Sequence, residues 1–81
     1  MPDSLPDIIT FLSELQSDNT VPRNVKTKIE SIINFLNEKG DVSLKVNKAL
    51  SLLDEISDDN NIQTYTRTQI WNIASMLESI N

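Results

Sequence analysis

Apolar residues recur along this chain at alternating spacings of three and four in four separate stretches. This spacing places one apolar stripe along an α-helix, and the stripe must then be buried against neighbouring helices. No stretch shows the strict apolar and polar alternation that is typical of a strand. The four stripes are Leu5, Ile8, Leu12 and Leu15; Val25, Ile29, Ile32 and Leu36; Val42, Val46, Ala49, Leu53 and Ile56; and Ile70, Ile73, Leu77 and Ile80.

The breaks around the second stripe carry residues that favour helix ends. Pro22 suits the first turn of the second helix, because the N–H that proline lacks is not needed there. Gly40 is expected to form the C-terminal cap of that helix, since glycine readily adopts a left-handed conformation. Asp41 or Ser43 is then expected to cap the third helix through its side-chain oxygen.

The third break is the polar cluster 57–61, whose short side chains favour turns and caps. Asp59 in this cluster is predicted to cap the fourth helix, which begins near Gln63. Asp18 is expected to play the equivalent role in the first turn.

A shift of the sequence by 41 residues places its first half on its second. Leu12-Ser-Glu then falls on Leu53-Asp-Glu, and Asp18-Asn falls on Asp59-Asn. Polar matches in register favour a repeated helical hairpin over coincidence between two apolar stripes. The chain is therefore predicted to be all-α, a single domain over 1–81 folded as a four-helix up-and-down bundle. Two repeated hairpins, approximately 4–39 and 43–81, would build it.

Composition excludes several classes of function. Among the 81 residues, 12 acidic against 7 basic side chains give a net charge of −5. This balance disfavours binding to a phosphate backbone, so no nucleic-acid partner is expected. The chain has no histidine and no cysteine, which removes imidazole and thiol nucleophiles and the usual ligands of zinc and haem.

Hydropathy bears on the compartment. The sequence contains no apolar run of about 18 residues that could span a bilayer. Its first residues lack a basic region followed by an apolar one. No membrane partner is therefore expected, and the predicted compartment is the cytoplasm.

Three blocks of the chain resemble a known family. They are Thr20-Val-Pro-Arg-Asn-Val25, Leu53-Asp-Glu-Ile-Ser57 and Tyr65-Thr-Arg-Thr-Gln-Ile-Trp-Asn-Ile73. In order and spacing they are similar to uncharacterised protein family 0147, whose members are small archaeal proteins, and the resemblance covers nearly the whole chain. It implies an all-α bundle in an archaeal cytoplasm. It implies no activity, substrate or catalytic residue.

Trp71 is the first candidate for partner binding. Helical geometry places it roughly 140° from the centre of the fourth stripe, so that it faces outward. Arg67, one turn earlier, could stack its guanidinium on the indole, and tryptophan and arginine are the residues most enriched in binding hot spots. The alternative is that Trp71 is buried beneath the segment around Leu5, because a lone tryptophan in a small domain is more often buried. Arg23 is the third candidate.

Four further apolar residues lie about 80–90° off their stripes. They could form two symmetric seams that pair with another copy of the chain. Alternatively they widen the stripes, because a bundle helix needs about three apolar positions in seven. The four residues are Phe11, Phe35, Leu52 and Met76.

Charged side chains cluster at two places. Asp54, Glu55, Asp58 and Asp59 form two carboxylate pairs at a spacing of four, but the stretch lacks the glycine and final glutamate of an EF-hand loop. A solvated helix end is expected there rather than a metal site.

The second cluster is a short basic patch at the start of the second helix, formed by Arg23, Lys26 and Lys28. It could bind a phosphate or an acidic segment. We expect it instead to be a solvated face that pairs across the bundle with the acidic helix ends.

The sequence thus favours a non-catalytic protein-interaction or structural module without a cofactor or a metal. It would present Trp71, Arg67 and Arg23 to a protein partner, or to a second copy of itself. Two alternatives remain open. One is a metal-dependent hydrolase built on the carboxylate pairs, and the other is a protein that associates weakly with nucleic acid through the basic patch.

Overall fold

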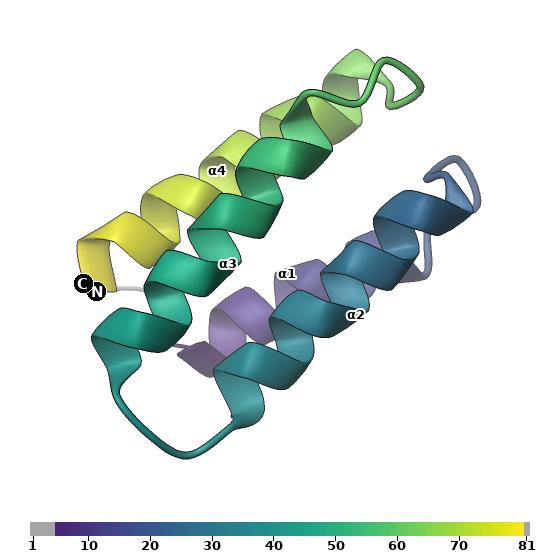
Figure 1. The fold of residues 1–81 in the computed structure, drawn as a ribbon. Coiled ribbons are helices and arrows are strands. Elements are labelled where there is room, and N and C mark those ends of the chain that lie inside the picture. The colour runs from purple at the N-terminus through teal and green to yellow at the C-terminus, as the bar shows by residue number, and fades with distance from the viewer. Residues whose placement is uncertain (1–4, 81) are drawn as a thin grey trace.

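Four helices form the bundle. The structure, a computed structural model, describes residues 5–80 and contains α1 (Leu5–Gln16), α2 (Arg23–Asn37), α3 (Val42–Ser57) and α4 (Thr64–Ile80). They run alternately up and down, and the α1–α2 and α3–α4 turns lie at the same end (Figure 1). The predicted all-α four-helix bundle is confirmed. The predicted hairpin bounds at 4 and 81 lie outside the described residues.

The helices pack as a closed ring in which each contacts two neighbours. The backbones of α2 and α3 approach each other most extensively and those of α1 and α4 least, while no Cα atoms of the diagonal pairs α1–α3 and α2–α4 lie within 8 Å of each other. Short connections favour this order, because they place consecutive helices antiparallel and side by side.

The predicted stripes form the buried core with three exceptions. Leu5 and Ile80 are only partly buried, and Val42 is 42% exposed. Val42 is the first residue of α3, so it lies beyond the turns of α3 that pack on α2. Two turn residues complete the core: Val21 between α1 and α2, which is 4% exposed, and Ile62 between α3 and α4, which is 6% exposed.

The two turns at the upper end share one hydrogen-bond pattern. An Asp18 carboxylate oxygen accepts from the Thr20 backbone N–H, and an Asp59 carboxylate oxygen accepts from that of Asn61, both at 2.8 Å. These are turn bonds inside the connections, so the prediction that Asp18 and Asp59 cap the following helices is wrong. The likeness of the two turns agrees with a repeated hairpin, although the duplication itself stays a prediction.

At the other end, Gly40 does not cap α2. The helix ends at Asn37, and the next residue, Glu38, is extended. Gly40 has φ of +136° and redirects the chain toward α3, a conformation that residues with a Cβ rarely adopt. The prediction for Asp41 is confirmed, because its side chain accepts from the Ser43 and Leu44 N–H groups at 2.8 and 3.4 Å.

A buried hydroxyl generates the first prediction. Thr66 is 1% exposed, and its hydroxyl finds no hydrogen-bond partner among the described residues. An unpaired buried hydroxyl costs about 1–3 kcal/mol. We expect Thr66→Val to raise the unfolding free energy by about 1 kcal/mol and the melting temperature by about 4–8 °C. Calorimetry measures the change.

The control for this prediction is Thr68→Val. Thr68 is exposed, and its hydroxyl donates to the Thr64 carbonyl at 3.1 Å. A surface change of this kind shifts stability by no more than about 0.5 kcal/mol. Equal effects of the two substitutions would contradict the assignment of an unpaired buried hydroxyl to Thr66.

The turn carboxylates generate a prediction about acid stability. The Thr20 hydroxyl and N–H lower the pKa of Asp18 below its ordinary 3.8, and the Asn61 N–H and the Asn24 side-chain amide lower that of Asp59. Because folding favours the ionised forms, their contribution is present above about pH 4 and is lost as pH falls through the folded pKa values.

We therefore expect the double variant Asp18→Asn, Asp59→Asn to lose less melting temperature than the unmodified chain between about pH 5 and about pH 2. Calorimetry across this range gives both slopes. Equal slopes would show that neither turn contributes to acid stability.

Candidate partner-binding surfaces

Trp71 lies on the outer surface of α4. Its side chain is 57% exposed. The outward projection is confirmed, and the alternative of burial beneath the segment around Leu5 is wrong. The buried residues of α4, which include Ile70, face the centre of the ring. Trp71 is the next residue, and successive side chains point in different directions round a helix, so the indole points outward.

Arg67 has a structural role in this fold. Its Nε donates to the Ser57 carbonyl and its Nη2 to the Asp59 carbonyl, both at 3.1 Å. The guanidinium therefore satisfies acceptors at the end of α3, where carbonyl groups lack helical partners. It is not stacked on Trp71. Among the described residues the cation over an aromatic ring is Lys48, 5.5 Å from the centre of Phe35.

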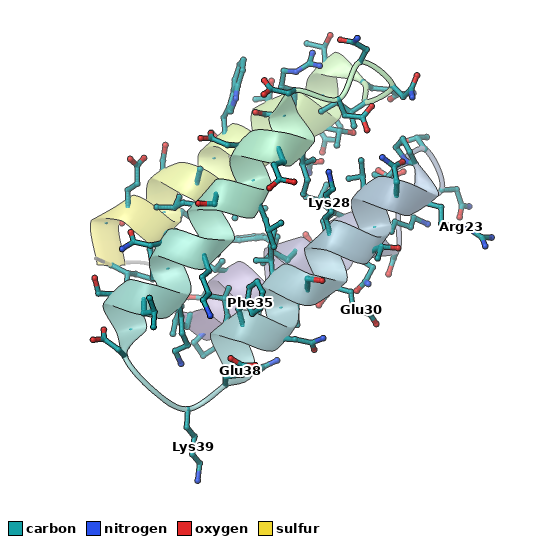
Figure 2. All side chains as sticks on the ribbon, viewed as in Figure 1. Arg23, Lys28, Glu30, Phe35, Glu38 and Lys39 are labelled. Atoms are coloured by element: carbon teal, nitrogen blue, oxygen red, sulfur yellow. The ribbon has the colours of Figure 1, made fainter. Side chains whose placement is uncertain are left out.

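Arg23 lies on a different helix from the other two candidates. It is exposed at the start of α2 and points away from the bundle (Figure 2). Since α2 and α4 are diagonal in the ring, the structure does not join Arg23 and Trp71 in one surface. Lys28 of the same basic patch pairs with Glu55 at 3.5 Å, so the expected pairing across the bundle is confirmed for this residue.

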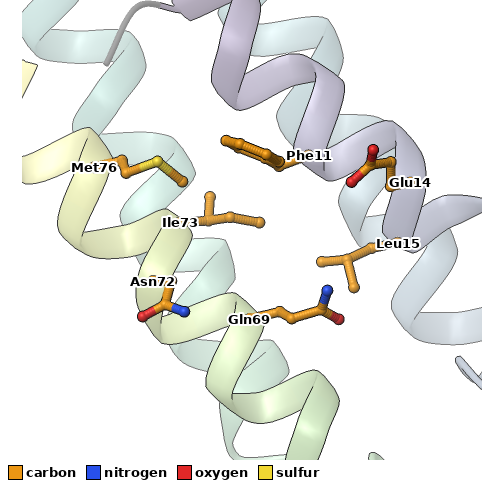
Figure 3. A pocket seen from close by; sticks show the side chains of 7 residues that line it. All are labelled: Phe11, Glu14, Leu15, Gln69, Asn72, Ile73 and Met76. Carbon is orange, nitrogen blue, oxygen red and sulfur yellow. The ribbon is translucent and has the colours of Figure 1, made fainter. Parts of the chain in front are cut away.

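A groove lies along the α1–α4 seam. It has a volume of about 350 Å³ and opens to solvent between the two helices (Figure 3). Phe11 from α1 and Ile73 from α4 point toward each other across it. The lining residues are Phe11, Glu14, Leu15, Gln69, Asn72, Ile73 and Met76.

Two polar groups of this groove lack partners within the described part of the chain. The side-chain carbonyl of Gln69 is buried without a hydrogen bond, although its amide nitrogen donates to the Tyr65 hydroxyl at 3.2 Å. Glu14 is exposed and forms no ion pair. The groove therefore combines an apolar floor with two acceptors.

The groove shows what sequence reasoning missed. Of the four apolar residues predicted to lie beside the stripes, Phe11 and Met76 both line this groove. The polar residues Gln69 and Asn72 carry no local signal, because amides on a helix surface are ordinary. The other two, Phe35 and Leu52, lie on α2 and α3 and are partly buried.

The acidic cluster does not converge. Among residues 5–80, no three carboxylates form a group that could hold a metal ion. Glu55 pairs with Lys28, and Asp59 accepts from the Asn24 side-chain amide at 2.9 Å. Within the same residues, no helix is long and apolar enough to cross a membrane.

Comparison with known proteins gives relatives over nearly the whole chain. A family model described as Uncharacterised protein family (UPF0147) matches residues 2–80. A UPF0147 protein of Methanosarcina mazei is 39% identical over 73 residues, which cover 89% of this chain and 78% of the relative. One of Archaeoglobus fulgidus is 39% identical over 77 residues, covering 95% and 88%.

Two crystal structures share the fold. One, of a protein of unknown function, superposes with a TM-score of 0.89 at 41% identity and covers 95% of this chain and 89% of its own. The other, from family UPF0147 of Thermoplasma acidophilum, has a TM-score of 0.89 at 31% identity and covers 94% and 91%. The names of these relatives state no activity or ligand.

The different roles of Arg67 and Trp71 generate a prediction. Arg67→Met removes two donors from carbonyl groups at the end of α3, so we expect it to cost about 1–3 kcal/mol of unfolding free energy. Trp71→Ala removes an exposed side chain and is expected to change stability by no more than about 0.5 kcal/mol. Urea unfolding of both variants measures the difference, and a larger loss for Trp71→Ala would contradict both assignments.

Proposed function

Since the chain belongs to the uncharacterised protein family UPF0147, whose members named above are archaeal, we propose that it is a non-catalytic protein-interaction module that receives a segment of another protein in the α1–α4 groove. The observation that carries this proposal is the open groove along the α1–α4 seam, where the two helices approach each other least. An amphipathic segment that lays its apolar face into a hydrophobic groove is a recurring mode of peptide recognition.

The openness of the groove, rather than its volume, supports a protein segment over a drug-sized molecule. Small-molecule sites enclose most of their ligand, whereas this groove of about 350 Å³ opens to solvent. Phe11 is 41% exposed at its edge. An exposed aromatic ring beside a shallow apolar depression is the usual composition of a protein interface core.

Charge supports a foreign partner over a second copy. Helix α1 carries no basic residue, and the only one in α4, Arg67, is committed to the carbonyl groups of the α3–α4 turn. A two-fold interface would place this same surface, with Glu14 and without a free cation, on both sides, so neither copy would offer a basic partner. The net charge of −5 adds to this repulsion.

Trp71 belongs to the proposal as a second contact surface on the same helix. It is exposed, and its removal is expected to leave the bundle intact, which suits a residue used for binding. Arg67 contributes indirectly, by holding the α3–α4 turn that precedes this helix. Arg23, at the start of α2, is at most a peripheral contact.

Site-specific photo-crosslinking tests the proposed function. A p-benzoylphenylalanine is introduced in place of Phe11, in place of Trp71, or in place of Thr27, an exposed residue on α2. Each protein is illuminated in native cell extract, and adducts are separated by mass. We expect a discrete adduct with another protein from position 11 and none from position 27.

Three results would contradict the proposal. Absence of any adduct from position 11 would remove the groove as a docking site. An adduct from position 71 alone would place the interface on the opposite flank of α4. An adduct of the chain with itself, increasing with protein concentration, would show that the occupant is a second copy.

A further inference from the structure

The α1–α4 seam has a counterpart in the same molecule. The shift of 41 residues that relates the two halves carries α1 onto α3 and α2 onto α4, so it relates the α1–α4 seam to the α2–α3 seam. The two seams can be compared position by position. One is closely packed, and the other contains the groove.

The apolar positions of the two seams are alike. Leu15 and Ile73 of the groove correspond to Ile56 and Ile32, all of them buried. The larger flanking residues, Phe11 and Met76, correspond to Leu52 and Phe35. Apolar volume is therefore similar in the two seams, and it does not account for the opening of one of them.

The polar positions differ in charge. In the α2–α3 seam, Lys28 reaches Glu55 at 3.5 Å, and Lys48 lies over the Phe35 ring. Glu55 corresponds to Glu14 of the groove, but Lys28 corresponds to the neutral Gln69. The groove thus keeps the carboxylate and lacks the cation.

Lys48 also has no cationic counterpart, since its position is occupied by Asp7 in α1. At these two positions, the lysines of the α2–α3 side therefore correspond to one neutral and one acidic residue. The buried carbonyl of Gln69 adds an acceptor that finds no donor within residues 5–80. Both features favour a ligand that brings a positive charge and N–H donors.

We propose that the segment received by the groove is basic, and that it places a lysine or arginine beside the Glu14 carboxylate and the Gln69 carbonyl while an apolar neighbour packs against Phe11 and Ile73. This inference rests on the proposed function and specifies the partner's chemistry. The incoming cation takes the place that Lys28 holds in the closed seam. Association is expected to weaken as salt rises, since the pair is at the surface.

Three matched peptides test the inference. Each is a short, terminally blocked amphipathic helix with a leucine face, and they differ at one position beside that face, which is lysine, norleucine or glutamate. They are titrated into the ¹⁵N-labelled full chain at low salt, and the amide signals of Phe11, Gln69 and Trp71 are followed. We expect the lysine peptide to bind at the groove about fivefold more tightly than the norleucine peptide.

Two variants separate the groove from the general acidity of the chain. Glu14→Gln removes the carboxylate of the groove, so the lysine and norleucine peptides should bind to it equally. Glu78→Gln, the control, removes an exposed carboxylate of α4 that does not line the groove, so the fivefold preference should persist. Both sites are exposed, and neither variant is expected to unfold the bundle.

The outcomes distinguish this inference from the proposed function. Binding of all three peptides at Phe11 and Gln69 with no preference for lysine would overturn the inference and leave the groove as a docking site. A preference lost equally in Glu14→Gln and Glu78→Gln would also overturn it, because the cause would be net charge. No shift at Phe11 or Gln69 with any peptide would overturn both.

Discussion

A closed ring of four helices has four seams, and each must be filled by side chains to keep water from the core. This bundle fills the α2–α3 seam most closely and the α1–α4 seam least. The core itself is complete, since Ile73 and Leu15 at the base of the groove are at most 2% exposed. The opening is therefore confined to the outer layer of the seam, where it costs little burial and leaves a surface that another molecule can reach.

Three of the seven basic residues make contacts that stabilise the fold. Arg67 satisfies carbonyl groups at the end of α3, and Lys45 donates to the Leu36 and Glu38 carbonyls at the end of α2. Lys28 pairs across the α2–α3 seam. Positive groups near a helix C-terminus are stabilising, so these placements hold the ring together. They also leave the α1 and α4 surface without a cation free to meet Glu14.

Local physics explains which features could be predicted from the sequence. The stripes from Ile8 to Leu77 and the cap at Asp41 depend on spacing and on one side chain, so the sequence alone indicates them. Gly40 and Arg67 were assigned to the wrong contacts. The role of Gly40 depends on the residue at which α2 ends, and that of Arg67 depends on which carbonyl groups at the end of α3 lack a partner. Neither can be predicted from a few neighbouring residues.

The groove could not be predicted from local sequence, because it forms only where α1 and α4 meet in the folded ring. Gln69 and Asn72 look like ordinary surface residues, and only the assembled α1–α4 seam makes them part of a cavity. A signal was nevertheless present in the sequence. The shift of 41 residues aligns Glu14 with Glu55, but it aligns the neutral Gln69 with Lys28. This difference between the two halves lies at the open seam.

A double-mutant cycle on the unfolding free energy tests the central claim, that Glu14 in the α1–α4 seam lacks the cationic partner that Lys28 provides for Glu55 in the α2–α3 seam. The cycle combines Gln69→Lys with Glu14→Gln. The account predicts that Gln69→Lys stabilises the chain and that the coupling between the two positions is favourable by about 0.2–1 kcal/mol, as for exposed ion pairs. A coupling of zero, or destabilisation by Gln69→Lys in the presence of Glu14, would contradict it.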